Sequence, residues 1–350
     1  MNKRVVITGM GLVSPLGCDV ELAWQRLLAG RSGLRTLPPA MGEGTGVAVV
    51  GWVPELHEDS EAGWNPDAVA SAKEQRRMDR FITFALGAAG QALAQARWAS
   101  PTAVQQERAA TIIGSGVGGF GTITEAVRTT DAKGPQRLSP FTVPAFLANL
   151  AAGQVSIRHQ LKGPLGAPVT ACAAGIQAIG DAARLIRNDE ADMALCGGSE
   201  ATIDRVALGS FAAAKALSTH FNDCPAKASR PFDSARDGFV MAEGAGLTPG
   251  QPLPDNLLAS YESLAKQDSP NQAVYEAFYG FVKDPTSITD ADQLGKVLDA
   301  KRSGNSADFV QALGKDGIDP QTGVEVLNQQ PQVGASSLES GQVQALSQFV

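Results

Sequence analysis

The sequence has few histidines, and its cysteines follow no regular spacing. Its 350 residues include three His and four Cys, and no two Cys form a C-x-x-C pair. The four cysteines are Cys18, Cys172, Cys196 and Cys224. This pattern argues against a disulfide scaffold and against a zinc site, and it is typical of a reducing compartment. We therefore expect a cytoplasmic protein that holds no metal.

Long apolar runs are also missing. No stretch reaches the ~18 apolar residues that a membrane span requires. The basic start is followed by a short apolar run that Gly9 and Gly11 interrupt, which indicates a first strand and not a signal peptide. We expect neither a membrane span nor a nucleic-acid partner.

Acidic charge is concentrated in the last third of the chain. Residues 1–247 carry 23 acidic and 23 basic residues, whereas residues 248–350 carry 13 and 6, so the net charge of −7 lies wholly in the second part. All three Tyr fall there, and all four Trp fall before it. Residues 248–254 read T-P-G-Q-P-L-P, which is typical of a linker. We therefore expect one domain over residues 1–247 and another over 248–350.

The first part is predicted to be α/β. The hydrophobic fraction of the whole chain is 43%, which suits a globular protein. Apolar and small-residue runs predict strands at 4–8, 110–113, 169–171 and 193–196. Longer periodic segments predict helices at 20–29, 74–97, 146–160 and 175–187. Strands that alternate with helices favour βαβ units around a mainly parallel sheet.

The second part is predicted to be mainly helical. Apolar residues recur at helical spacing in 255–266, 273–282, 290–300 and 307–313. From Asp316 on, the chain is rich in Gln, Ser and Gly, and we expect it to be partly disordered. This segment resembles no family that we recognise.

A glycine-rich segment follows the predicted strand at 110–113. Residues 114–119 read G-S-G-V-G-G and match the dinucleotide pattern G-x-G-x-x-G. That fingerprint also needs an acidic residue at a strand end about 20 residues on, and Asp131 lies in a segment expected to be a loop. The alternative is that the glycines let the backbone pass close to another surface, such as an acyl chain or the Cys172 loop.

Cys172 lies where a predicted strand turns into a predicted helix. Residues with extended preference precede it, and the helix-like stretch begins at Gly175. A helix N-terminus carries a partial positive charge and free N–H groups, so it favours a thiolate. Small neighbours leave room for a substrate carbonyl and for backbone donors beside it. We interpret Cys172 as a nucleophile that becomes acylated, with a buried structural Cys as the alternative.

Eight blocks of the sequence share one resemblance. They are residues 5–17, 73–79, 114–119, 139–144, T-A-C-A-A-G at 170–175, G-G-S-E at 197–200, 211–218 and 228–246. In this order, over about 70% of the chain, they resemble the N-terminal part of the β-ketoacyl-acyl-carrier-protein synthases of the type II elongating class. Those proteins are condensing enzymes with a thiolase fold. The last block departs slightly, with Ala242 where the family usually has Gly.

The resemblance implies a two-step reaction. Cys172 would take an acyl group from a carrier-protein thioester, and a carbanion from decarboxylating malonyl carrier protein would then attack it. Covalent catalysis divides a difficult C–C bond formation into two steps. The resemblance implies that Val117 and Phe211 line the acyl pocket, with core packing as the alternative for both. It implies no metal and no redox cofactor.

The resemblance also implies protein partners. It places five basic residues where the acidic acyl carrier protein docks, although a solvated helix face is the alternative for each of them. They are Lys73, Arg76, Arg77, Arg137 and Lys215. It further implies a homodimer.

The sequence departs from this family in its histidines. The family's condensing chemistry uses two His in its C-terminal half, and residues 248–350 contain none. His57, His159 and His220 stand in no such motif, and we expect structural or surface roles for them. Two classes therefore stay open. One is an acyltransferase of fatty-acid or polyketide elongation. The other is a catalytically incomplete fragment or chimera that binds carrier protein or is acylated at Cys172 without condensing.

Overall fold

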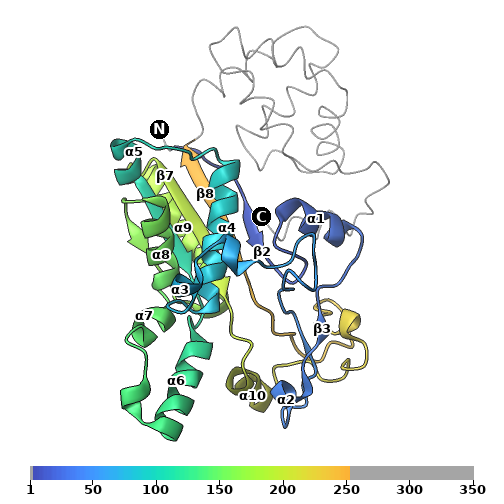
Figure 1. Ribbon diagram of the computed structural model, residues 1–350. Helices are drawn as coiled ribbons and strands as arrows, with labels where there is room; N and C mark the ends of the chain where they lie inside the picture. The colour runs from blue at the N-terminus through green and yellow to red at the C-terminus, as the bar shows by residue number, and fades with distance from the viewer. Residues whose placement is uncertain (1–2, 253–350) are drawn as a thin grey trace, which may run out of the picture. The chain divides into compact units, whose positions relative to one another are not determined.

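A mixed six-stranded sheet forms the centre of the computed structural model, which describes residues 3–252 (Figure 1). The strand order is β1-β8-β7-β5-β6, and β2 also pairs with β8. The bounds of the strands are β1 (Val5–Ile7), β2 (Gly11–Val13), β5 (Ala109–Gly114), β6 (Leu165–Gly166), β7 (Met193–Glu200) and β8 (Gly244–Pro252). A separate two-stranded sheet pairs β3 (Arg35–Thr36) with β4 (Val49–Val50).

Strand β8 makes the sheet mixed. It runs antiparallel to β1, β2 and β7, whereas β5 runs parallel to β6 and β7. The prediction of a mainly parallel sheet is therefore wrong. Gly197 of β7 allows close contact with β8, because a Cβ on Gly197 would lie 2.0 Å from the carbonyl oxygen of Gly246. Residues 248–252 of the predicted linker lie in this strand, and the compact unit that contains the sheet ends at Pro252.

Helices cover both faces of the sheet (Figure 1). Helices α4 (Arg80–Gln95) and α8 (Leu150–His159) pack on one face, and α9 (Ala174–Arg187) packs on the other. Side chains of a strand alternate between its two faces. Ile113 and Leu195 accordingly enter the core with α4, whereas Ile112 and Cys196 enter the core with α9. The predictions of buried strands at 110–113 and 193–196 are confirmed.

The remaining helices lie around this centre. They are α1 (Val20–Leu28), α2 (Pro39–Gly42), α3 (Ala72–Gln75), α5 (Ala103–Glu107), α6 (Phe120–Lys133), α7 (Thr142–Phe146) and α10 (Arg205–Ala213), with 3-10 turns η1 (Pro66–Ala68), η2 (Pro135–Arg137), η3 (Ala171–Ala173) and η4 (Pro225–Lys227). The predicted helices at 20–29 and 175–187 are confirmed as α1 and α9, and the predicted first strand is confirmed as β1.

One predicted helix is divided in two, and another begins later than predicted. The segment 74–97 is divided between α3 and α4, because Asp79, the residue before α4, has extended backbone (φ −69°, ψ 163°), and its carboxylate makes no capping hydrogen bond to α4. That carboxylate accepts hydrogen bonds from the backbone N and Oγ1 of Thr122 in α6, at 3.0 and 2.7 Å. The helix predicted at 146–160 begins at Leu150, as α8; Phe146 instead ends α7, and its carbonyl accepts from the N–H of Gly119 at 2.9 Å. Tertiary hydrogen bonds thus hold the chain at both boundaries, before α4 and after α7.

Two further predictions need correction. The strand predicted at 169–171 does not form; the strand on this edge of the sheet is β6, and Ala171 has a φ of +51° that a strand excludes. The segment 129–135 was expected to be a loop, but α6 continues to Lys133 and ends at Gly134, whose φ is +85°. The helices predicted after residue 254 lie outside the described residues.

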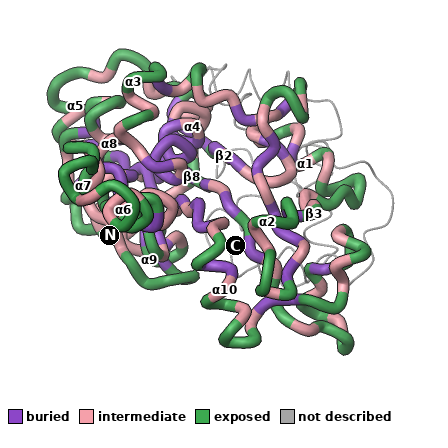
Figure 2. The backbone as a smooth tube through the Cα atoms, turned by 60° about the horizontal axis from the view of Figure 1, so that its bottom comes forward, coloured by how far each residue is buried: buried purple, intermediate pink, exposed green. Residues whose placement is uncertain are grey.

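A third core lies away from the main sheet. It contains Val50 of β4 and Leu208 of α10, together with Leu217 and Met241 from connecting segments. Figure 2 shows buried backbone both around α4, β2 and β8 and in the region of this third core. Within residues 3–252, no helix is long and apolar enough to cross a membrane.

The contact between β2 and α4 leaves no room for a side chain at Gly11. A Cβ there would lie 1.8 Å from the carbonyl oxygen of Ala88, which belongs to the helix backbone. We expect Gly11→Ala to lower the free energy of unfolding by about 3 kcal/mol, because the strand must move away from the helix. Urea denaturation followed by circular dichroism measures this change.

Gly90 on the same helix is the matched control. A Cβ at Gly90 meets no atom within 4 Å. Gly90→Ala should leave stability unchanged or raise it by up to about 1 kcal/mol, because alanine restricts the unfolded chain. Equal losses in the two variants would contradict the proposed role of this close contact.

Candidate functional site

Cys172 lies in the turn that leads into α9. It is the middle residue of η3 and is exposed, and α9 begins two residues later. The turn is held by local hydrogen bonds: the N–H of Ala173 donates to the carbonyl of Thr170 at 3.1 Å, and Oγ1 of Thr170 donates to Oε1 of Gln177 at 2.8 Å. Ala171 adopts a left-handed φ of +51°. A non-glycine residue persists there only when surrounding structure enforces it, and such positions cluster at functional sites.

Glycines bring the start of α9 against the ends of β5 and β7. A Cβ on Gly114 would lie 2.5 Å from the carbonyl oxygen of Ala174, and one on Gly198 would lie 3.1 Å from the Cα of Gly175. Any side chain at these positions would push the helix, and Cys172 with it, away from the sheet. The expectation that the glycine-rich segment lets the backbone pass close to the Cys172 loop is confirmed.

The N–H groups of the glycine-rich segment point at a carboxylate of the protein itself. Glu200 accepts hydrogen bonds from the N–H groups of Gly116 and Val117, at 2.6 and 3.0 Å, and from Oγ of Ser115 at 3.3 Å. Glu200 is half-buried, and burial raises its pKa above the ordinary value although the backbone donors act in the opposite direction. Asp131, the acidic partner that a dinucleotide site would use, lies within α6 and not at a strand end.

Sequence reasoning included Glu200 only as part of a matching block. The signal that could have identified it is a carboxylate at the end of a predicted strand that contains few other polar residues. The residue therefore joins the site through its contacts and not through its sequence pattern.

Val117 and Phe211 occupy different elements. Val117 follows Gly116 in the loop beside the Cys172 turn and is 47% exposed. Phe211 lies on α10, is 41% exposed and packs edge-on against Phe239, with ring centroids 5.4 Å apart. Neither side chain is buried, so within residues 3–252 neither is packed fully into a core.

The five basic residues come from three segments. Lys73 and Arg76 are exposed at α3, whereas Arg77 lies over the ring of Phe141, 4.1 Å from its centroid. Arg137 is exposed at the end of η2, and Lys215 is exposed after α10. The contact of Arg77 with Phe141 joins the first segment to the loop that follows Arg137.

The other cysteines and the histidines have distinct surroundings. Burial raises the pKa of Cys18 and of Cys196 to about 12, and Cys224 is exposed. His159 ends α8, and burial lowers its pKa, with the charge of Arg158 acting in the same direction. The N–H of His220 donates to the carboxylate of Asp237 at 2.8 Å. His57 is exposed in a turn.

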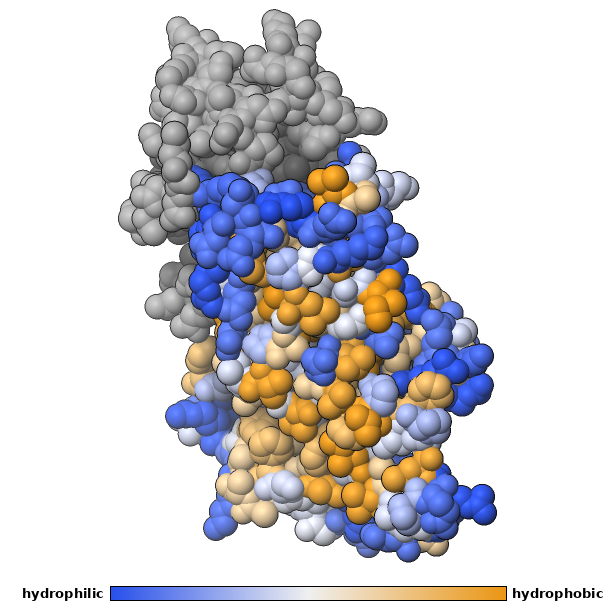
Figure 3. Space-filling view, turned by 90° about the vertical axis from the view of Figure 1, so that its left-hand side faces the viewer, coloured by the Kyte–Doolittle hydropathy of each residue, from blue (hydrophilic) through white to orange (hydrophobic). Residues whose placement is uncertain are grey.

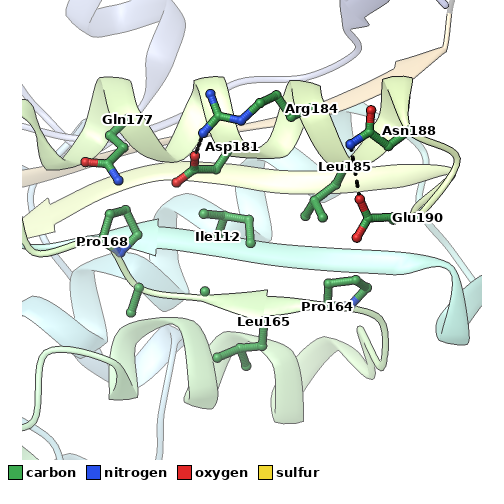
Figure 4. Close-up of a pocket in the computed structure, with 12 residues that line it drawn as sticks. Ile112, Pro164, Leu165, Pro168, Gln177, Asp181, Arg184, Leu185, Asn188 and Glu190 are labelled. Atoms are coloured by element: carbon green, nitrogen blue, oxygen red, sulfur yellow. Dashed lines mark hydrogen bonds and ion pairs between the residues drawn. The ribbon is translucent and has the colours of Figure 1, made fainter.

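A groove of about 490 Å³ runs along the outer edge of the sheet, between β6 and α9 (Figure 4). Leu165 and the prolines at 164 and 168 form one wall, and Gln177, Asp181 and Arg184 project from α9. Cys172 is not among its lining residues. Across residues 3–252, no group of three or more His, Cys, Asp or Glu side chains is placed to hold a metal ion.

The chain resembles known proteins over most of its described part. Residues 2–248 match the family described as beta-ketoacyl synthase, N-terminal domain. A 3-oxoacyl-acyl-carrier-protein synthase 2 of Rhizobium meliloti (strain 1021) is 49% identical over 70% of this chain. A protein of the same name from Staphylococcus aureus (strain COL) is 38% identical over 93% of this chain and 72% of its own length. The chain spans only 58% of the Rhizobium protein.

A solved structure agrees with these relatives. It is described as a type II PKS acyl-carrier protein in complex with its ketosynthase bound to the hexaketide, and it is 27% identical with a TM-score of 0.60. The match covers 72% of this chain and 59% of that chain.

The environments of the cysteines predict a selective reaction. At pH 8 we expect iodoacetamide to modify the exposed Cys172 and Cys224, and to spare Cys18 and Cys196 until the protein unfolds. With pKa values of about 12, only about one in ten thousand of the Cys18 and Cys196 thiols is ionised at this pH. Peptide mapping by mass spectrometry, with and without urea, measures the four rates. Rapid labelling of Cys196 in the folded protein would contradict the buried environment.

Proposed function

Because the chain belongs to the β-ketoacyl synthase family, we propose that Cys172 accepts an acyl group from a carrier-protein thioester. The observation that carries this proposal is the exposed thiol in the turn before α9, against the glycine-rich ends of β5 and β7. The helix of 14 residues directs its N-terminus toward this turn, which favours the thiolate and a negatively charged oxygen beside it. The proposed catalytic residue is Cys172.

The proposed reaction has two steps. In the first, Sγ of Cys172 attacks the thioester carbon, the bond to the carrier thiol breaks, and that thiol leaves with the proton of Cys172. The N–H of Cys172 would donate to the oxygen that becomes negative. In the second, malonyl carrier protein loses carbon dioxide, its carbanion attacks the acyl carbon, the bond to Sγ breaks, and Cys172 leaves as the thiolate, which regains a proton from water. Neither step uses a metal or a redox cofactor. Val117 and Phe211 are proposed to contact the acyl chain.

The proposed partner is an acyl carrier protein. The exposed side chains of Lys73, Arg76, Arg137 and Lys215, together with Arg77, offer positive charge to an acidic partner. Such charges steer the encounter more than they add affinity. The similar solved structure described as a complex of a carrier protein with its ketosynthase supports this proposal. The absence of a disulfide among the four free cysteines is consistent with a cytoplasmic location, which we also propose.

A second candidate is acylation without condensation. The sequence contains three His, and none stands in the two motifs that the family uses to activate malonyl carrier protein. On this proposal the chain performs the first step at Cys172 and lacks the second.

Intact mass measurement distinguishes the two candidates. After incubation with octanoyl carrier protein we expect one added octanoyl group on the wild type and none on Cys172→Ala. Addition of malonyl carrier protein should then yield β-ketoacyl product for a complete enzyme and none for the second candidate. A wild type that never gains the acyl group would exclude both.

The outer edge of the sheet is proposed to bind a second copy of the chain. Among residues 3–252, strand β6 pairs only with β5, so its other edge has no strand partner in this part of the chain. Leu165 and Val169 on this edge, and Ile176 and Ile179 of α9, are exposed, and the groove lies between the two elements. Figure 3 shows the wide apolar area on the face that includes this edge. Apolar surfaces of this kind mark protein interaction sites.

Charge placed on this face should separate the copies. We expect a homodimer by light scattering for the wild type, and a monomer for Ile176→Asp, because Ile176 is 65% exposed on α9 and a buried carboxylate disfavours the interface. Leu28→Asp is the control, since Leu28 is 54% exposed on α1, on the other side of the sheet in Figure 1. A variant at Ile176 that remains dimeric would exclude this face.

A further inference from the structure

One carboxylate holds the loop at 115–118 from a neighbouring strand. Glu200 ends β7, and its side chain reaches across the end of β5 to accept from the N–H groups of Gly116 and Val117 and from Oγ of Ser115. Oγ of Ser115 in turn accepts from the N–H of Gly118 at 3.0 Å. Successive N–H groups that point at one spot form an anion-binding concavity, and here the protein supplies the anion.

This loop is also the neighbour of the Cys172 turn. A Cβ on Gly116 would lie 3.6 Å from the Cα of Ala171 and 2.8 Å from Oε2 of Glu200. The N–H of Ser115 donates to the carbonyl of Pro168 at 3.3 Å. The loop therefore fits between Glu200 on one side and the residue before Cys172 on the other. If Glu200 no longer accepts these hydrogen bonds, the loop at 115–118 beside the Cys172 thiol is free to move.

The carboxylate is retained at a cost to stability. Burial raises the pKa of Glu200 even though at least three donors favour its charged form. A carboxyl group whose pKa is raised by folding contributes most at low pH, and this contribution is lost as the pH rises through the folded value. At neutral pH the ionised side chain is therefore less favourable here than in water. Proteins accept such costs at functional sites.

We propose that Glu200 is a positioning residue for acyl transfer to Cys172, because it fixes the loop at 115–118 against the Cys172 turn. The incoming acyl chain then meets a rigid surface, including Val117, beside the thiol. Small displacements of such surfaces change rates strongly, since a shift of about 1 Å can slow a reaction a hundredfold. This inference rests on the proposed function and adds to it the residue that holds the site in shape.

Glu200→Gln is the variant that tests the role. It keeps the shape of the side chain but removes its charge and one of its two acceptor oxygens, so the N–H donors of the loop lose a charge-assisted acceptor. Ser115→Ala is the second variant, because it removes one donor to Glu200 and the acceptor of Gly118 without changing the backbone. Glu243→Gln is the matched control: Glu243 is a buried carboxylate, burial raises its pKa, and it accepts from the N–H of Val53 at 3.1 Å.

The full-length chain is assayed in two ways. Amide hydrogen exchange of the peptide that contains residues 115–118 measures how firmly the loop is held. Octanoyl-pantetheine serves as a thioester that needs no carrier docking. Sγ of Cys172 forms the new C–S bond, and pantetheine leaves as the free thiol with the proton of Cys172. The acylation rate is divided by the rate of iodoacetamide alkylation at Cys172, which corrects for general changes in exposure.

We expect Glu200→Gln to raise loop exchange at least about tenfold and to lower the acylation-to-alkylation ratio about tenfold. Ser115→Ala should shift both in the same direction and by less. Glu243→Gln should lower the melting temperature and leave both quantities within about twofold of the wild type.

Three results would overturn the positioning role. Two of them concern it alone: loop exchange that is unchanged in both loop variants, or faster exchange with an unchanged acylation ratio. The third is a wild-type chain that takes no octanoyl group while Cys172 still reacts with iodoacetamide. That result refutes the proposed function, and the positioning role with it.

Discussion

The contact between the start of α9 and the ends of β5 and β7 determines the geometry of this molecule's site. A Cβ on Gly114 would lie 2.5 Å from the carbonyl oxygen of Ala174, and a Cβ on Gly198 would lie 3.1 Å from the Cα of Gly175. Cys172 lies in the turn just before the helix, the glycine-rich loop follows β5, and Glu200 ends β7. One backbone contact therefore brings the thiol, the loop and the carboxylate together. Glycine is required here for packing, and the reactive group depends on that packing for its position.

Three carboxylates connect segments that are distant in the sequence. Asp79 binds the first turn of α6, Glu200 binds the glycine-rich loop, and Glu243 binds Arg80 through its Nε and Nη2 and also binds the N–H of Val53. Burial raises the pKa of two of them, Glu200 and Glu243, so their charged forms add little or nothing to stability at neutral pH. Apolar burial in the cores on the two faces of the sheet supplies the stability. The polar contacts determine which arrangement of the loops the folded chain adopts.

Sequence pattern was sufficient where one face of an element decides its structure. Helices α1 and α9 follow from the periodicity of their apolar residues, whereas strands β5 and β7 follow from runs of apolar and small residues, because nearly all of their residues are buried. The sequence pattern failed where contacts with residues distant in the sequence decide the local structure. Strand β8 contains Pro249 and three glycines and reads as a linker, yet β7 on one side and β1 and β2 on the other hold it extended. Asp79 reads as a helix position until Thr122 is placed beside it. The small neighbours of Cys172 and the helix after it were enough to predict it as a site residue, whereas the contacts of Glu200 could be found only from the fold.

Acyl capture and condensation make separate demands on a protein of this family. Capture needs an exposed thiol, donors for one oxygen and a fixed surface for the acyl chain. Among the described residues, the exposed thiol of Cys172 lies beside the loop that Glu200 holds. Condensation also needs groups that stabilise the charge left when malonyl carrier protein loses carbon dioxide, and the sequence has no His in the motifs that the resemblance implies for them. A covalent intermediate allows the first demand to be met without the second. An exposed thioester is also open to water, so a chain that captures without condensing would release its acyl group by hydrolysis unless another surface covers Cys172. The lifetime of the acyl group, more than its formation, therefore depends on what packs over this turn.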